Sequence, residues 1–232
     1  MRNRISVTHL DSYQYYLDTD MSEQELYERL YGAYSPTLAM QAGTALHKLL
    51  EDCSDTLDSK CGDFEFVFDS GIDGEIITGE PCEREVKHVW QGVQGVDLVG
   101  IIDVDAPFMV IDHKLTSRYD PERYFNSWQW RAYLTMLGKD KFRYQVFECS
   151  DIKPGEPITI KDYHTLDMHA YEGMQNEVIG LVGELAELIN KWLVQGLPCK
   201  KGIDFKKLAN DWDKDLKGFF NLSEDEFNWR NK

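Results

Sequence analysis

The sequence has no long uninterrupted apolar run. Of its 232 residues, 42% are hydrophobic and 28% are charged, and no stretch approaches the roughly 20 apolar residues that a membrane-spanning helix needs. The N-terminal segment MRNRISVTHLDSYQYY also lacks the apolar core of a secretory signal peptide. We therefore expect a soluble globular protein of the cytoplasm that makes no membrane contact.

Paired cysteines are also missing. The five cysteines are scattered without a CxxC pair, at Cys53, Cys61, Cys82, Cys149 and Cys199. Their odd number and wide spacing argue against a disulfide framework and against a zinc site, so we expect reduced thiols. The sequence contains no Walker motif either, which means that any helicase partner would be a separate chain.

Positive charge is scarce. The chain has 25 Lys and Arg residues against 41 Asp and Glu residues, a formal net charge of −16. Nucleic acid repels such a protein at long range, which argues against a protein that coats DNA. An enzyme with a local basic groove and acidic outer faces remains compatible with this balance, and a bound metal would offset part of the local negative charge.

The most informative stretch runs from Asp97 to Ser117 and reads DLVGIIDVDAPFMVIDHKLTS. Two runs rich in Val and Ile flank Ala106-Pro107, which predicts a β-hairpin with a two-residue turn at these positions. In that register Asp103 would lie opposite Val110.

Three charged residues interrupt these apolar runs: Asp103, Asp112 and Lys114. Because side chains alternate along a strand, all three are expected on one face as diagonal neighbours. Two carboxylates and an ammonium beside a buried sheet are costly unless they bind something. A divalent cation suits the carboxylates, and the ammonium could orient or help to deprotonate a water. The alternative is an exposed hairpin face with an incidental salt bridge.

A helix start is predicted at Ser35-Pro36, with Ser as N-cap and Pro at the first helical position. The helix should run from Pro36 to about Cys53 and place Gly43 and His47 on one stripe, one turn apart. A glycine inside a helix costs about 1 kcal/mol relative to alanine. We therefore expect the helix to pack closely at Gly43 and to bring His47 against another element. An ordinary helix histidine is the alternative.

The remaining periodicity predicts a mixed sheet between helices. Further helices are expected over residues 5–18, 22–31, 121–137 and 166–193, and further strands over 63–68, 82–90, 142–149 and 157–163. This order indicates an α/β or α+β chain with a single domain over residues 1–232. Its core should span about residues 36–165, with N-terminal helices and a C-terminal helical extension.

Four motifs in order resemble the RecB-like branch of the PD-(D/E)XK nuclease superfamily. They are GTALH at Gly43–His47, GIID at Gly100–Asp103, VIDHK at Val110–Lys114 and QWRAY at Gln129–Tyr133. Each motif alone is weak, and their order carries the resemblance. It implies an α/β fold with a restriction-endonuclease-like core, in which helices flank a mixed central β-sheet.

The resemblance implies roles for the residues nearest the hairpin. Asp103 and Asp112 would be catalytic carboxylates that hold a metal ion. His47 and the backbone carbonyl of His113 would be further metal ligands. Lys114 would position the attacking water and stabilise charge on the phosphate. Oxygen ligands with one histidine suit Mg²⁺ or Mn²⁺ better than zinc.

The resemblance also implies supporting residues. Gln129 and Tyr133, one helical turn apart, would support the site and bind the substrate strand. Glu85, on the preceding strand, would be an accessory acidic residue. Independently of the resemblance, Thr116 and Ser117 could donate hydrogen bonds to a phosphate or cap their own loop.

Aromatic residues and arginines interleave just after the hairpin. Stacking and phosphate contact with a single strand would use such a cluster, and core packing is the alternative. Its members are Tyr124, Phe125, Trp128, Trp130, Arg118, Arg123 and Arg131. Some RecB-like relatives carry an iron–sulfur cluster held by one N-terminal and three C-terminal cysteines. This chain lacks that cysteine pattern, so we expect no iron–sulfur cluster.

The expected activity is Mg²⁺- or Mn²⁺-dependent hydrolysis of DNA by a stand-alone exonuclease of phage type, in recombination, repair or DNA degradation. DNA is the expected partner, and a recombination or single-strand-binding protein is a candidate second one. The alternatives are a structure-specific endonuclease on the same core and a catalytically silent module that binds nucleic acid or a recombination protein.

Overall fold

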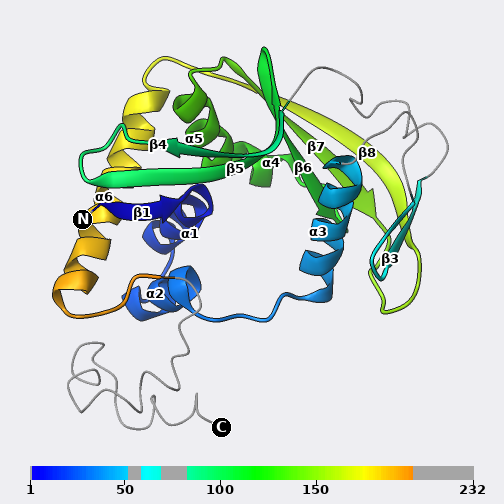
Figure 1. Ribbon diagram of the computed structural model, residues 1–232, viewed down its shortest axis with the longest axis horizontal. Coiled ribbons are helices and arrows are strands. Elements are labelled where there is room, and N and C mark those ends of the chain that lie inside the picture. The colour runs from blue at the N-terminus through cyan, green and yellow to red at the C-terminus, as the bar shows by residue number, and fades with distance from the viewer. Residues whose placement is uncertain (1, 52–58, 69–82, 201–232) are drawn as a thin grey trace, which may run out of the picture. The chain divides into compact units, whose positions relative to one another are not determined.

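The computed structural model describes residues 2–51, 59–68 and 83–200 (Figure 1). The helices are α1 (Val7–Asp18), α2 (Glu23–Tyr31), α3 (Leu38–Glu51), α4 (Pro121–Asn126), α5 (Trp128–Leu137) and α6 (Met174–Val194). The strands are β1 (Asn3–Ser6), β2 (Lys60–Cys61), β3 (Phe64–Phe68), β4 (Glu83–Trp90), β5 (Val96–Ala106), β6 (Met109–Thr116), β7 (Lys141–Cys149) and β8 (Ile158–His169). Within these ranges no helix is both long and apolar enough to span a bilayer.

The described residues form two compact units. The first contains residues 2–8 and 36–182 and holds the whole sheet, and the second contains residues 9–35 and 183–200. In the second unit Trp192 packs edge-on against Tyr27, with ring centroids 5.1 Å apart, and its indole N–H donates to Glu23 at 2.8 Å. The single domain over residues 1–232 stays a prediction.

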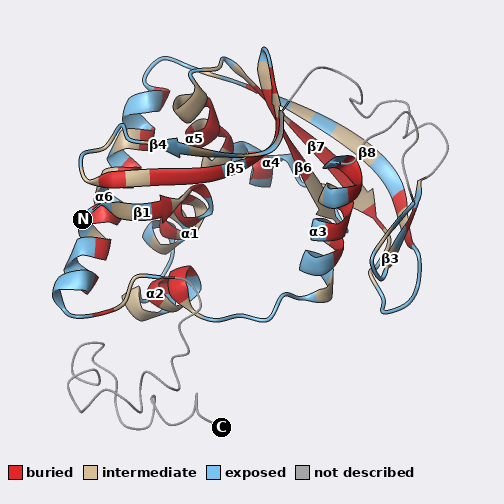
Figure 2. Ribbon diagram, in the orientation of Figure 1, coloured by how far each residue is buried: buried red, intermediate tan, exposed pale blue. Residues whose placement is uncertain are grey.

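The sheet of the first unit has eight strands. Seven follow the order β1-β5-β6-β7-β8-β3-β2, and β4 pairs with β5 off this path. The β1/β5, β6/β7 and β3/β8 pairs are parallel, and the other pairs are antiparallel. Buried residues concentrate along β5, β6 and β7 (Figure 2). The predicted α/β class, with a mixed central sheet and flanking helices, is confirmed.

Helix α3 packs against β3 and β6 through one apolar stripe. Ala42, Leu46, Leu49 and Leu50 recur at helical spacing and are buried. They join a core cluster with strand residues that include Phe66 and Phe147. Burying each large apolar side chain contributes about 1.5–3 kcal/mol. This packing fixes α3 on the sheet, and it therefore fixes the position of His47 beside the buried stripe.

The hairpin register differs from the prediction. Ala106 pairs with Met109 and Asp105 with Val110, so the turn falls at Pro107-Phe108 instead of Ala106-Pro107. The shift is by two residues, which preserves the alternation of faces. When the pairing is extended by one residue beyond Val104 and Ile111, Asp103 lies opposite Asp112 instead of Val110. The exposed tip residue Phe108 and the buried Val104–Ile111 pair fit this register.

Two predicted helices differ in extent. The helix expected over 121–137 is divided at Ser127, whose backbone is extended (φ −64°, ψ 141°) and whose hydroxyl accepts from Gln129 N at the start of α5. The helix expected over 166–193 begins only at Met174, because Leu166–His169 continues β8 against β7. Pairing with β7 outweighs the local helical pattern of this segment.

The remaining boundaries lie close to the predicted ones. Helix α3 starts at Leu38, two residues later than predicted, with the Thr37 hydroxyl accepting from Met40 N at 3.3 Å. Residues 3–6 form strand β1 rather than the start of a helix, because they pair with β5. Cys61, Cys149 and Cys199 are free thiols, whereas Cys53 and Cys82 lie outside the described residues.

Candidate active site

Strand β5 changes partner at the centre of the GIID motif. On one edge β4 pairs with residues 98–105 of β5. On the opposite edge β1 pairs with residues 96–99, and β6 pairs with residues 104–106. Residues 100–103 therefore face a fork between β1 and β6, where the backbone needs other hydrogen-bond partners.

Side chains complete the hydrogen bonding inside this fork. The Tyr133 hydroxyl of α5 donates to the Ile101 carbonyl at 2.6 Å. The backbone N–H of His113 on β6 donates to Asp103 Oδ2 at 2.7 Å. Because Asp103 bridges two strands, its carboxylate is held by backbone rather than by a mobile loop.

Gly100 makes room for the tyrosine that fills the fork. A Cβ at position 100 would lie 2.3 Å from Cε1 of Tyr133 and 3.2 Å from Cγ2 of Val7. The Tyr133 ring is buried and stacks on Phe142, with centroids 6.3 Å apart. The glycine of GIID and the tyrosine of QWRAY thus form a single packing contact. The two motifs in the sequence are the signal that could have revealed it.

Asp112 lies on the facing strand and is 2% exposed. Gln129 donates to its Oδ1 at 2.7 Å, and the Lys114 ammonium pairs with its Oδ2. Burial raises the pKa of Asp112 to about 6, although the charge of Lys114 opposes this shift. Burial also opposes the charged form of Lys114, but the charges of Asp112 and Asp103 outweigh it and raise the pKa of Lys114. Lys114 is therefore a positively charged donor at neutral pH.

A second group converges on Asp103 from other elements. His47 Nδ1 of α3 lies 3.3 Å from Asp103 Oδ1. Ligand atoms of His47, Asp103 and Glu85 all lie within 4.8 Å of one another. Burial lowers the pKa of His47, but the hydrogen bond with Asp103 and the charges of Asp103 and Asp112 together outweigh it, and the net pKa is raised. Burial raises the pKa of Asp103, but the hydrogen bond and charge of His47 and the charges of His113 and Lys114 together outweigh it, and the net pKa is lowered.

This group fits a divalent cation that takes oxygen and nitrogen ligands. An ion among the three donors would relieve the repulsion between two carboxylates, and its donor set is one that Mg²⁺ and Mn²⁺ accept. Glu85 belongs to this group of side-chain donors, and the side chain of Asp112 is not one of its three members. The two Asp112 oxygens contact Gln129 and Lys114 instead. The roles of Asp112 and of the His113 backbone carbonyl as further ligands stay predictions.

Glu85 has an unusual backbone conformation. Its φ of 52° makes it the one non-glycine with positive φ among the residues that the structure describes. Its neighbours pair with β5 at Arg84↔Val104 and Val86↔Ile102, so Glu85 comes opposite Asp103. Burial and the charge of Asp103 raise the pKa of Glu85. Such strained conformations cost about 1–3 kcal/mol and concentrate at functional sites.

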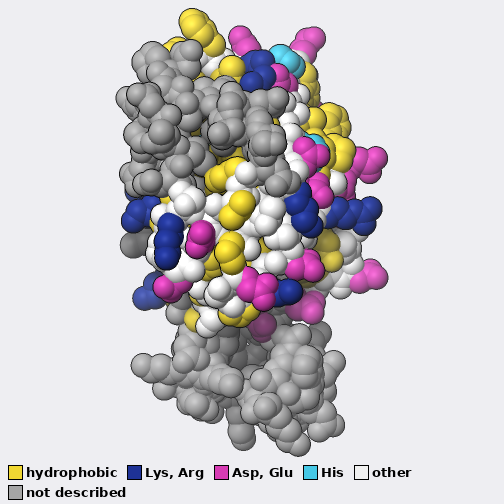
Figure 3. All heavy atoms as spheres, turned by 90° about the vertical axis from the view of Figure 1, so that its right-hand side faces the viewer, with side chains coloured by type: hydrophobic (Ala, Val, Ile, Leu, Met, Phe, Trp, Pro, Cys, Tyr) yellow, Lys and Arg dark blue, Asp and Glu magenta, His cyan; other side chains and the backbone are white. Residues whose placement is uncertain are grey.

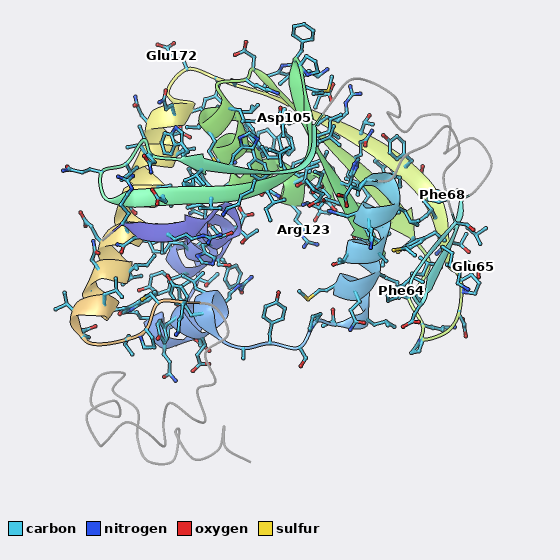
Figure 4. All side chains as sticks on the ribbon, in the orientation of Figure 1. Phe64, Glu65, Phe68, Asp105, Arg123 and Glu172 are labelled. Atoms are coloured by element: carbon cyan, nitrogen blue, oxygen red, sulfur yellow. The ribbon has the colours of Figure 1, made fainter. Side chains whose placement is uncertain are left out.

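The aromatic and basic cluster is partly accounted for by packing. The Arg131 guanidinium lies 4.4 Å from the ring centroid of Trp130 and 5.3 Å from that of Trp128, and it donates to the Ser127 carbonyl at 2.7 Å. By contrast, Arg118 and Arg123 are exposed, and Arg123 extends from α4 away from the sheet (Figure 4).

The two hydroxyls after Lys114 lie at the end of β6. The Thr116 hydroxyl donates to the Arg118 carbonyl at 2.8 Å, which is the loop-capping arrangement. Ser117 is exposed. A phosphate contact by either residue stays a prediction.

Solved exonuclease structures share this fold. An alkaline exonuclease from Laribacter hongkongensis is 15% identical with a TM-score of 0.51, and the match covers 83% of this chain and 91% of that chain. A phage-related exonuclease from Haemophilus somnus 129PT is 8% identical with a TM-score of 0.53, over 84% of this chain and 97% of that chain. No protein-family model and no curated protein matches the sequence. The chain therefore has the fold of these exonucleases, as the sequence resemblance predicts.

Proposed function

We propose that the chain is a metal-dependent nuclease that hydrolyses DNA phosphodiester bonds at the fork of β5. The observation that carries this proposal is the convergence of Asp103, Asp112 and Lys114 on β5 and β6 with His47 on α3. Backbone and buried side chains hold these groups in place, as a preorganised catalytic site requires.

A bound Mg²⁺ or Mn²⁺ ion would supply positive charge to a non-bridging phosphate oxygen. His47, Asp103 and Glu85 would hold it through the converging donors described above. Asp112 and the backbone carbonyl of His113 would be further ligands. The charged Lys114 ammonium would orient the attacking water and stabilise the negative charge that develops on the phosphate. Its raised pKa supports this role over that of a proton acceptor.

Gln129 and Tyr133 act as positioning residues in this proposal. Gln129 donates to Asp112 Oδ1 and so orients the carboxylate toward Lys114. Tyr133 fixes the backbone at Ile101, two residues before Asp103. Direct contact of these two side chains with the substrate strand is a second part of the proposal, which the exposed Arg118 and Arg123 would assist.

The specific form of the proposal is exonuclease action on DNA. The protein would act in recombination, repair or DNA degradation, in the cytoplasm of a cell that hosts a phage. The support for exonuclease action is the likeness to the alkaline and phage-related exonucleases. A recombination or single-strand-binding protein is the proposed protein partner.

Cleavage of end-labelled linear DNA and closed circular DNA tests the proposal, with Mg²⁺ or Mn²⁺ and with EDTA as control. We expect wild type to degrade linear DNA in the presence of metal, and Asp112→Ala and Lys114→Ala to be inactive. Cutting of closed circles would identify an endonuclease instead. Binding of DNA without cleavage of any substrate would identify a catalytically silent module.

A further inference from the structure

Gly43 lies in α3, one helical turn before His47. The close packing predicted at this glycine is not found among the described residues, because a Cβ at position 43 would meet none of their heavy atoms within 4 Å apart from its chain neighbours and the backbone of its own helix. Glycine destabilises a helix interior relative to alanine. Packing among the described residues therefore gives no reason for glycine at this position.

The segment around Gly43 also differs from the rest of the chain in charge. Although 41 of 232 residues are acidic, residues 35–50 contain no Asp or Glu. The exposed positions in the first turns of α3 carry small or uncharged side chains, among them Ala39, Gln41 and Thr44. A phosphodiester meets less repulsion here than on a surface with the average charge of this protein.

Figure 3 shows the side of the molecule that lies at the right in Figure 1, where acidic and basic side chains of the described residues are interspersed. Residues 35–50 differ from this mixed surface because they include no acidic residue. Segment 35–50 is thus distinguished by its charge, and Gly43 within it by the lack of a side chain.

We infer that Gly43 is a positioning residue that leaves room for the substrate strand. The sugar–phosphate backbone of the nucleotide beside the scissile one would pass over α3 at Gly43. Helix geometry places Gly43 about 6 Å along the helix axis from His47, so both residues would contact neighbouring parts of one strand. Gly43 contributes space and no chemical group. The inference rests on the proposed nuclease function and names the path by which the nucleic acid enters.

The test compares Gly43→Ala and Gly43→Leu with the same changes at Gly180 in α6. Gly180 is a matched control, because a Cβ there also would meet no described heavy atom within 4 Å apart from its chain neighbours and the backbone of its own helix. Alanine and leucine favour helix, so each variant should unfold at a temperature equal to or up to about 2–4 °C above that of wild type. Binding of a fluorescent single-stranded oligonucleotide in Ca²⁺ is measured by anisotropy. Hydrolysis of thymidine 5′-phosphate p-nitrophenyl ester in Mn²⁺ is measured separately.

We expect Gly43→Leu to weaken oligonucleotide binding by about tenfold or more, Gly43→Ala to weaken it less, and both Gly180 variants to bind as wild type. Hydrolysis of the small ester should stay close to the wild-type rate, because this substrate has no neighbouring nucleotide. Wild-type binding by Gly43→Leu, or equal losses at Gly43 and Gly180, would overturn the inference while the nuclease proposal stands. A wild-type protein that binds the oligonucleotide but hydrolyses neither DNA nor the ester would contradict the nuclease proposal alone. A protein that binds no nucleic acid would overturn both.

Discussion

Two aspartates on β5, two residues apart, have almost the same histidine contact and very different surroundings. Asp103 Oδ1 lies 3.3 Å from His47, and Asp105 Oδ2 lies 3.3 Å from His88. The other Asp105 oxygen pairs with the Lys139 ammonium, which also donates to the Ala106 carbonyl at 2.6 Å. Cationic or hydrogen-bonding partners thus surround the Asp105 carboxylate.

Asp103 has a different set of neighbours. Its second oxygen accepts from the His113 backbone, and a further carboxylate, Glu85, approaches within the three-donor group. Negative charge is therefore in excess at the fork, whereas the Lys139 ammonium neutralises the Asp105 carboxylate near the hairpin turn. Position relative to the fork, rather than residue type, separates a candidate metal site from a structural ion pair.

The largest expected difference between the two aspartates concerns catalysis. Asp103→Asn should lower the rate of DNA hydrolysis by about 10²–10³-fold or more, because it removes charge from the reacting site. Asp105→Asn should leave the rate near that of wild type. Initial rates at saturating Mn²⁺ give the comparison, and equal loss in both variants would remove the distinction.

The second difference concerns stability. Asp105→Asn and Lys139→Met each break a largely buried ion pair, with side chains 15% and 19% exposed, and leave one charged partner behind. We expect each change to lower the free energy of unfolding by about 1.5–3 kcal/mol. Asp103→Asn should cost less, since it relieves the repulsion with Glu85. Denaturant unfolding in EDTA measures all three, and the opposite order would contradict the account.

The third difference appears in the pH dependence of metal binding. A cation binds the deprotonated forms of Asp112 and His47. The pKa of Asp112 is raised to about 6, and the pKa of His47 is raised above its ordinary value. Affinity for Mn²⁺ should therefore rise as pH increases through these values and fall below about pH 6, by up to about tenfold per pH unit for each proton displaced. Calorimetric titration at several pH values checks this. Asp105→Asn should keep the wild-type profile, and a flat wild-type profile would argue against both ligands.

The smallest expected effect concerns the tyrosine in the fork. Tyr133→Phe removes the donor to the Ile101 carbonyl and should cost about 0.5–1.5 kcal/mol of stability. If Tyr133 acts by positioning Asp103, the substitution should lower kcat more than it changes KM. A rise in KM alone would instead indicate direct substrate contact.

Gly100→Ala offers a complementary measurement, because its Cβ would collide with the Tyr133 ring. The change should be strongly destabilising in wild type and less so in a Tyr133→Ala background. Additive losses in this double-mutant cycle would show that the two residues are not coupled.

Alternation along strands predicted the most important feature, the shared face of Asp103, Asp112 and Lys114. It succeeded although the turn was placed at the wrong residues, because a shift of two preserves every face. The fork was not predictable, since it depends on where β1 ends and β6 begins along the edge of β5. The same holds for Leu166–His169, whose helical pattern is outweighed by pairing with β7.

The two glycines at the site also show what the sequence alone does not predict. Gly43 and Gly100 were both noticeable in the sequence, yet only contacts in three dimensions separate their roles. A Cβ at Gly100 would collide with Tyr133, whereas a Cβ at Gly43 would meet no described atom within 4 Å beyond its chain neighbours and the backbone of its own helix. The spacing of a motif in one sequence does not distinguish a glycine that admits another side chain from one that leaves space open.

The most direct test of the central claim is the location of Mn²⁺ by anomalous scattering from crystals of the wild-type protein grown with this ion. The account predicts a Mn²⁺ ion at the fork, coordinated by His47 and Asp103. An ion bound at Asp105 and His88 instead, or no ion at the fork under conditions that support DNA cleavage, would contradict it.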